Sequence, residues 1–320
     1  MVTGMMVRNR TDSQGRWVTT QRIGYWLSQK WLLVPRMLVA LALLASLGLA
    51  GTGCAKEERV FRFSGIPDQD AARWALRYGA VAEYLSQELG VTVKGVPSVD
   101  YAAVVVGFEQ GEIHMGWFGG LTGVQARLAV PGAEAIAQRP RDANFHSVFI
   151  VQAGLPVVGL ADLKGLTFTF GSESSTSGHL MPRHFLLEAG VDPDTDFSGL
   201  PSYSGSHDKT WKLVESGAYQ AGALNEAVWE TAVSEGKVDL SKVRVFYITP
   251  PYYDYNWTVR GDLDETFGEG FKDRVTAALL AIGPAQQDIL DLFNTDSFIE
   301  TSNENYDAIL SVAQQVGIIQ

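Results

Sequence analysis

The chain contains a strand-like segment that runs through a hydroxyl-rich turn into a helix, and this order is typical of α/β proteins. Residues 166–170 include β-branched and aromatic residues suited to a buried strand, and Gly171 ends the run. Apolar residues then return at helical spacing over positions 180–187. The sequence therefore predicts a helix that begins near residues 175–177, directly after the end of a strand.

The turn carries more hydroxyl groups than the start of a helix requires. The first amides of a helix lack partners within it, and the helix dipole places partial positive charge there, so such a terminus favours an anion. A single serine would suffice for an N-cap or an ST turn, which is the structural alternative. Residue types alone leave both interpretations open. The hydroxyl groups in question belong to Ser174, Ser175, Thr176 and Ser177.

Residues 1–53 are predicted to form a signal peptide and not part of the fold. Basic residues precede an apolar core at 37–50, which is short for a transmembrane helix and is followed by small residues and Cys54. This arrangement resembles the lipid-attachment site of bacterial lipoproteins, with Cys54 as the mature N-terminus. Cleavage with release into the periplasm is one alternative, and a protein that is not exported is another.

Without residues 1–53 the protein would be strongly acidic. The chain has 25 basic and 36 acidic residues, and residues 1–53 contain six of the basic residues and one of the acidic ones. The remainder therefore has 19 basic and 35 acidic residues, which gives a net charge of −16. This balance argues against nucleic acid as a partner. The remaining length of about 265 residues suits one large or two medium α/β domains. Cys54 is the only cysteine, so no disulfide can form within the chain.

The alternation of patterns predicts two α/β lobes, the first made of residues 57–151 with 250–320 and the second of residues 152–249. The chain would then cross between the lobes twice, which is the layout of a hinged ligand trap. Asp68 is expected to cap the first helix. Strand patterns occur at 60–64, 91–96, 113–117, 134–137, 147–152, 166–170, 220–224 and 243–248, and helix patterns at 68–90, 101–111, 175–187, 208–216, 226–234, 271–282, 285–293 and 304–316. Ligands bind beyond the carboxyl ends of such strands, where Ser64, Trp117, Gly171 and Asn225 fall.

Six motifs in a fixed order resemble one family over nearly all of the chain after residue 60. The family is the phosphate, phosphite and phosphonate periplasmic binding proteins of ABC transporters, which are type II solute-binding proteins. Within it, the motifs are most similar to members assigned to selenate transport. The motifs are WFGGLTGVQAR at 117–127, FTFGS at 168–172, STSG at 175–178 with LMP at 180–182, GSHDKT at 205–210, AGALN at 221–225 and DYNWTVRG at 254–261.

The resemblance implies an oxyanion pocket built from several loops. The hydroxyl groups and amides of residues 174–177 would hold ligand oxygens, His207 would donate to the anion, and Asp254 would accept a ligand proton. The loop of Trp117, Phe118, Gly119 and Gly120 would form a wall of the first lobe. Each has a structural alternative: His207 as a helix cap, Trp117 as a core residue and Asp254 as a solvated turn residue.

The position of Asn225 bears on the ligand. In aminophosphonate binders of this family, an acidic residue in the second lobe meets the ammonium group of the ligand. If Asn225 points into the cleft and Glu226 away from it, no carboxylate waits there for an amine. The resemblance then favours a small oxyanion without an amino group, and it leaves phosphite, methylphosphonate, phosphate, selenate and selenite open.

An enzyme is the competing class, because Ser177, His207 and Asp208 supply the residue types of a hydrolytic triad. The chain has no Gly-x-Ser-x-Gly elbow, and the side chains of adjacent residues normally point in different directions. The resemblance implies instead a monomer without a cofactor that serves an ABC permease and ATPase. A receptor that presents its anion to a sensor kinase is a third possibility. The remaining histidines, His114, His146, His179 and His184, lack metal-site spacing.

Overall fold

The structure is a computed structural model that describes residues 10–11, 17–18 and 59–320. Strands β1 (Arg10–Thr11) and β2 (Trp17–Val18) pair antiparallel. They belong to a unit of residues 1–57 that is separate from the unit of residues 58–320. The apolar core at 37–50 and Cys54 lie outside the described residues. Within the described residues, no helix has both the length and the apolar character needed to cross a membrane.

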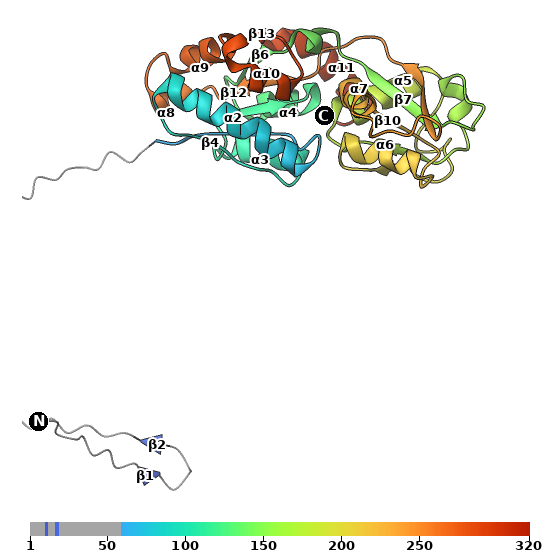
Figure 1. Cartoon of the computed structure of the whole chain (residues 1–320), viewed down its shortest axis with the longest axis horizontal. Coiled ribbons are helices and arrows are strands. Elements are labelled where there is room, and N and C mark those ends of the chain that lie inside the picture. Colours follow the sequence, from blue (N-terminus) through green and yellow to red (C-terminus); the bar gives the residue numbers. More distant parts are fainter. Residues whose placement is uncertain (1–9, 12–16, 19–58) are drawn as a thin grey trace, which may run out of the picture. The chain divides into compact units, whose positions relative to one another are not determined.

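The first lobe is built on a mixed six-stranded sheet with strand order β13-β6-β12-β5-β3-β4. Strands β4, β3 and β5 are parallel, whereas β12 runs antiparallel between β5 and β6. The strands are β3 (Phe61–Gly65), β4 (Val93–Gly95), β5 (Met115–Phe118), β6 (Glu134–Gln138), β12 (Asn256–Val259) and β13 (Ile299–Glu300). The α-helices are α2 (Ala71–Leu89), α3 (Tyr101–Glu109), α4 (Gly120–Ala129), α8 (Leu263–Phe267), α9 (Phe271–Leu280), α10 (Gln287–Phe293) and α11 (Asp307–Gln315) (Figure 1).

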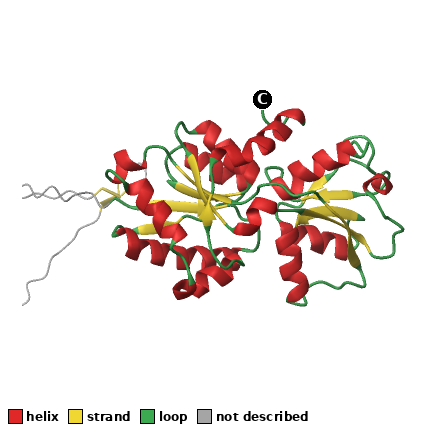
Figure 2. Cartoon of the chain, turned by 90° about the horizontal axis from the view of Figure 1, so that it is seen from above, coloured by secondary structure: helices red, strands yellow, loops and turns green. Residues whose placement is uncertain are grey.

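The second lobe has a five-stranded sheet with strand order β11-β7-β10-β8-β9 and helices on both faces (Figure 2). Separate apolar clusters pack around Phe149 and Phe168 on one face and around Ile150 and Trp211 on the other. The strands are β7 (Ser147–Gln152), β8 (Phe168–Phe170), β9 (Ser202–Tyr203), β10 (Ala221–Asn225) and β11 (Val243–Ile248), and the helices are α5 (Met181–Glu188), α6 (His207–Glu215) and α7 (Glu226–Ser234). Short 3₁₀ turns η1 (Pro140–Asn144), η2 (Leu160–Leu163), η4 (Pro284–Gln286) and η5 (Asn303–Tyr306) complete the two lobes.

The two crossovers between the lobes run side by side. The backbones of Phe145 and Tyr252 exchange hydrogen bonds of 2.8 and 3.0 Å, and the Asp254 N–H donates to the Asp142 carbonyl at 3.0 Å. Strand β7 follows the first crossover and pairs with β10 and β11 in the second sheet. The predicted boundary at residues 151/152 is therefore wrong by one strand. The apolar run of β7 is buried on both faces, which suits a central position between two strands.

Two further details differ from the sequence prediction. The cap of α2 is Asp70, whose carboxylate accepts from the Arg73 N–H at 2.9 Å, and not Asp68, which is buried. Helix α4 was not predicted, because Gly120 and Gly123 lower its helix propensity. Its residues Leu121, Val124 and Ala126 are buried, and this tertiary packing stabilises the helix despite the glycines.

Candidate anion-binding site

The hydroxyl-rich turn begins with a wide helical turn. Ser175 is the N-cap, and its hydroxyl oxygen accepts from the Gly178 N–H at 2.9 Å. The Leu180 N–H donates to the Ser175 carbonyl at 2.9 Å, five residues back, so η3 (Thr176–Leu180) is a π-type turn that leads into α5. This confirms the predicted start of the helix. The wide turn buries Thr176 and Ser177 facing the first lobe, while Ser174 remains partly exposed.

Backbone amides at the start of α4 contact this turn from the first lobe. The Leu121 N–H donates to the Thr176 hydroxyl oxygen at 2.9 Å, and the Gly120 N–H donates to the Asp254 carboxylate at 2.9 Å. A Cβ atom added to Gly119 would lie 3.0 Å from the Thr176 hydroxyl oxygen and 3.1 Å from the same carboxylate. Glycine at position 119 therefore lets the two lobes approach closely.

His207 contacts the other side of the turn as a neutral donor. A Cβ atom on Gly178 would lie 3.0 Å from both the His207 ring and the Ser175 hydroxyl oxygen. Burial lowers the pKa of His207 to about 4, so the ring is neutral at pH 7. Its Nδ1 atom accepts from the Asn225 backbone N–H at 3.3 Å, which places the single ring proton on Nε2.

Three buried polar atoms around the turn have no hydrogen-bond partner among the described residues: the Tyr101 hydroxyl, His207 Nε2 and Asp254 Oδ2. Each side chain is about 1% exposed. The Tyr101 hydroxyl lies beside Ser175, and Asp254 lies near the hydroxyl groups of Thr176 and Ser177. A buried polar group without a partner is costly, so this arrangement is suited to a ligand that accepts from the first two atoms and shares a proton with the third.

Asp254 holds its proton more tightly than an ordinary aspartate. Burial raises its pKa to about 7, and the Gly120 N–H with the nearby hydroxyl groups opposes part of that shift. Near neutral pH the carboxyl group can therefore either donate to an anion oxygen or accept from a protonated one. The sequence alternative of a solvated turn residue is wrong, because the side chain is buried.

The structure places Trp117 and Phe118 in the core of the first lobe and not in the cleft. Trp117 stacks on Tyr255 with ring centres 5.6 Å apart, and Phe118 packs edge-on against Phe108 at 5.5 Å. The predicted wall is thus formed by Gly119 and Gly120, and the two aromatic side chains support it from behind. Large apolar rings gain more from burial in the core than from lining a site for a charged ligand.

Asn225 supports the site instead of pointing a free amide into it. Its side-chain oxygen caps α7 by accepting from the Val228 N–H at 3.0 Å, and its side-chain nitrogen donates to the Tyr255 hydroxyl at 3.0 Å. Asp208 does not form a triad with His207, since its carboxylate accepts from Ser206 at 2.7 Å and from Lys212 at 2.9 Å.

Tyr101 is the site residue that sequence reasoning missed. It begins α3 and shares the apolar face of that helix with Val104 and Phe108, so its spacing indicates a core residue. Its ring is indeed in the core, and only the hydroxyl group reaches the turn. No local pattern shows that a tyrosine at position 101 meets a serine at position 175, because the contact depends on the approach of the two lobes.

Comparison with known proteins identifies the family. Residues 63–306 match the family described as the periplasmic substrate-binding protein of phosphonate ABC transporters. The chain belongs to this family. It is therefore the substrate-binding component of an ABC importer, with the two-lobed fold of type II periplasmic binding proteins. Its cargo is a small oxyanion of the phosphonate class, and its place of action is the periplasm.

The chain is similar to several characterised or curated members. It is 41% identical, over 82% of its length and 91% of the relative, to the "Probable ABC transporter phosphite binding protein PhnD1" of Prochlorococcus marinus (strain MIT 9301). The structure of PhnD1 in complex with methylphosphonate matches with a TM-score of 0.79 and covers 82% of this chain and 100% of PhnD1. The phosphonates-binding periplasmic protein of Escherichia coli (strain K12) is 26% identical over 44% of each chain. The likeness to members assigned to selenate transport stays a prediction.

Proposed function

We propose that the protein binds a compact phosphorus oxyanion without an amino group, with methylphosphonate and phosphite as the leading ligands. The anion would lie between the Ser175–Ser177 turn and the residues Tyr101, His207 and Asp254. The convergence of the three unpartnered buried polar atoms on this turn supports the proposal most directly. The relative bound to methylphosphonate supports the choice of ligand.

The electrostatics of the site fit an anion that keeps one proton. The donors at the turn are hydroxyl groups, backbone amides and a neutral histidine, which carry no formal charge. Arg77 and Arg139 lie nearby, but each is paired with a carboxylate, Asp68 and Asp142 respectively. A fully ionised anion would meet the Asp254 carboxylate, so a shared proton between the two groups would stabilise the complex.

The tight approach of the lobes favours a small ligand. The Leu121 N–H contacts Thr176 on one side of the turn, and the His207 N–H donates to the Asp68 carbonyl at 3.2 Å on the other. A bulky substituent on phosphorus would separate these groups and break both hydrogen bonds. We therefore expect affinity to decrease as the substituent grows beyond a methyl group.

An aminophosphonate would find no free carboxylate for its ammonium group. Asn225 presents an amide that is already bonded, and Asp68, the buried carboxylate near His207 and Tyr101, is engaged by Arg77 at 3.5 Å and by the Tyr255 hydroxyl at 3.2 Å. Burying an unpaired ammonium group is costly. We expect 2-aminoethylphosphonate to bind at least tenfold more weakly than methylphosphonate.

We further propose that the protein is a monomer and not an enzyme, and that it is held at the membrane by lipid on Cys54. The engagement of Asp208 with Ser206 and Lys212 argues against a hydrolytic triad.

The lipid anchor is tested with a Cys54→Ser variant, which should appear in the soluble periplasmic fraction. Unchanged membrane association of this variant would exclude the lipid anchor. A sensor kinase encoded beside this gene, in place of a permease and an ATPase, would favour the receptor alternative.

Isothermal titration calorimetry at pH 7 tests the ligand. The panel is methylphosphonate, phosphite, phosphate, selenate, selenite and 2-aminoethylphosphonate, and the radius of gyration from small-angle scattering is measured with each. The expected result is tight binding of methylphosphonate or phosphite, with a smaller radius of gyration. Tightest binding of the aminophosphonate, or no binding of any oxyanion, would overturn the proposal.

A further inference from the structure

We infer that Tyr255 is a positioning residue that couples contact between the lobes to the placement of His207, without itself donating to the anion. This inference rests on the proposed function, because it assigns a role to Tyr255 in retaining the ligand. Four residues carry it through a closed cycle of hydrogen bonds. Asp68 and Tyr255 come from the first lobe, and His207 and Asn225 come from the second.

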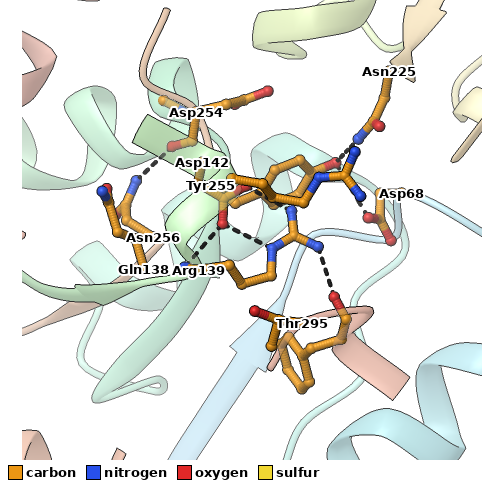
Figure 3. A network of polar contacts seen from close by, with 12 residues as sticks. Asp68, Gln138, Arg139, Asp142, Asn225, Asp254, Tyr255, Asn256 and Thr295 are labelled. Atoms are coloured by element: carbon orange, nitrogen blue, oxygen red, sulfur yellow. Dashed lines mark hydrogen bonds and ion pairs between the residues drawn. The ribbon is translucent and has the colours of Figure 1, made fainter. Parts of the chain in front are cut away.

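The cycle joins the lobes at two places. The His207 N–H donates to the Asp68 carbonyl at 3.2 Å, and the Asn225 side-chain amide donates to the Tyr255 hydroxyl at 3.0 Å. Tyr255 in turn donates to the Asp68 carboxylate at 3.2 Å, and the Asn225 backbone N–H donates to His207 Nδ1 at 3.3 Å. Figure 3 shows Asn225, Tyr255 and Asp68 facing one another.

The first lobe holds the Tyr255 hydroxyl in a fixed position. The ring stacks on Trp117 with centres 5.6 Å apart, and the Arg139 guanidinium lies 5.0 Å from its centre. Arg139 is itself fixed by its pair with Asp142 and by a 2.9 Å hydrogen bond to the Phe293 carbonyl. Since this packing lies within the first lobe, the hydroxyl group is in place before the second lobe approaches.

The second lobe holds Asn225 just as firmly. Its side-chain oxygen caps α7, so its side-chain nitrogen must point toward Tyr255. Its backbone N–H holds the His207 ring with Nε2 toward the serine turn. Within this cycle, contact between the lobes therefore adds two hydrogen bonds, one at the His207 backbone and one at the side chain of Asn225, whose backbone N–H orients the His207 ring.

The Tyr255 hydroxyl has no proton left for the anion, because its single proton is donated to Asp68 and its oxygen accepts from Asn225. Its effect on binding must therefore come from stabilising the conformation in which the two lobes are in contact. Loss of the hydroxyl group should speed ligand release, which requires the lobes to part. Ligand entry into the separated lobes should be unaffected.

Stopped-flow measurement of methylphosphonate binding to Tyr255→Phe tests this inference. The dissociation rate should rise about three- to tenfold, the effect of one lost hydrogen bond, while the association rate stays within about twofold of wild type. Asn225→Ser keeps a capping oxygen but removes the amide donor, so it should raise the dissociation rate by a similar factor. The double variant should then release ligand little faster than either single variant.

Tyr84→Phe is the matched control. It also removes one buried tyrosine hydroxyl, which donates to the Ala278 carbonyl at 2.8 Å within the first lobe, away from the cycle. Its dissociation rate should match wild type. An unchanged dissociation rate in Tyr255→Phe, or the same increase in Tyr84→Phe, would overturn the inference. The proposed function would still stand in that case, provided that the wild-type protein binds the oxyanion. Failure of wild-type protein to bind any oxyanion would overturn both.

Discussion

The backbone N–H of Leu121 in the first lobe donates to the side-chain oxygen of Thr176 in the second lobe at 2.9 Å. A residue of the proposed anion site is therefore also part of the contact between the lobes. The Thr176 hydroxyl oxygen accepts from Leu121, and its proton is shared with the Asp254 carboxylate in the ligand-free protein, so a bound anion oxygen would take over this proton. Ligand capture and lobe contact thus depend on one hydroxyl group.

Thr176→Val should weaken methylphosphonate binding by roughly ten- to a hundredfold, because it removes a hydrogen bond to a charged ligand worth about 1.5–3 kcal/mol. Valine preserves the shape of the side chain, so packing at this buried position is retained. Thr176→Ser keeps the hydroxyl group and serves as the control, with affinity within about threefold of wild type. Calorimetry would contradict the assignment if the valine variant bound as tightly as the serine variant.

His207→Ala should cost at least as much affinity, because it removes the neutral Nε2–H donor whose pKa burial has lowered to about 4. His207→Gln restores a neutral donor and should recover part of the loss. Since the ring stays neutral above about pH 5, titration of His207 should not alter wild-type affinity between pH 6 and 8. Equal affinities of the alanine variant and wild type would exclude His207 from the site.

The order of elements in both lobes could be predicted from sequence because local signals determine it. The apolar period of α2, its end at Gly90 with φ of 66°, and the apolar run of β7 are all visible in a few residues. The assignment of β7 to a lobe was not predictable in this way, since it depends on pairing with β10 and β11, tens of residues further along the chain.

The candidate site could be predicted only in part. The serine turn, His207 and Asp254 stand in recognisable motifs, and the structure brings them together. Trp117 was assigned to the wall because its motif adjoins the cleft, yet stacking on Tyr255 draws its ring into the core. Tyr101 was missed because sequence periodicity gives the direction of a ring and not what its hydroxyl group meets.

The ligand-free protein should lose stability as the pH falls from about 6.5 to 4.5. Burial lowers the pKa values of His114, His179 and His207 to about 4, below the value of about 6.5 for unfolded chains. The unfolded state therefore binds more protons in this window, and the stability from the neutral rings is lost as they must become charged. The raised pKa values of Asp254 and Asp142 act in the opposite sense, but they are two groups against three.

Thermal unfolding at pH 7, 6 and 5 measures this loss, with the melting temperature expected to fall at each step. His179→Asn removes one of the three titrating rings and should make the melting temperature depend less steeply on pH. A melting temperature that is constant or rises toward pH 5 would contradict the burial of neutral histidines.

Asp254 should make ligand binding consume a proton above pH 7. At pH 8.5 its carboxyl group, with a pKa of about 7, is ionised, and so is a phosphonate-type anion, since the second pKa of a phosphate group is about 6. Two negative groups in contact in a buried site bind one proton between them. Calorimetry at pH 8.5 in buffers of different ionisation enthalpy should show uptake of about one proton per ligand, and affinity should fall up to about tenfold per pH unit above pH 8.

The variant Asp254→Asn keeps an oxygen that can accept from the Gly120 N–H, but its side chain cannot ionise, so proton uptake on binding should disappear. Asp208→Asn is the control: it removes the carboxylate next to His207 in the sequence, which is bonded to Lys212, and it should leave the proton uptake intact. Binding by wild type without proton uptake at pH 8.5 would show that the Asp254 carboxylate does not contact the anion.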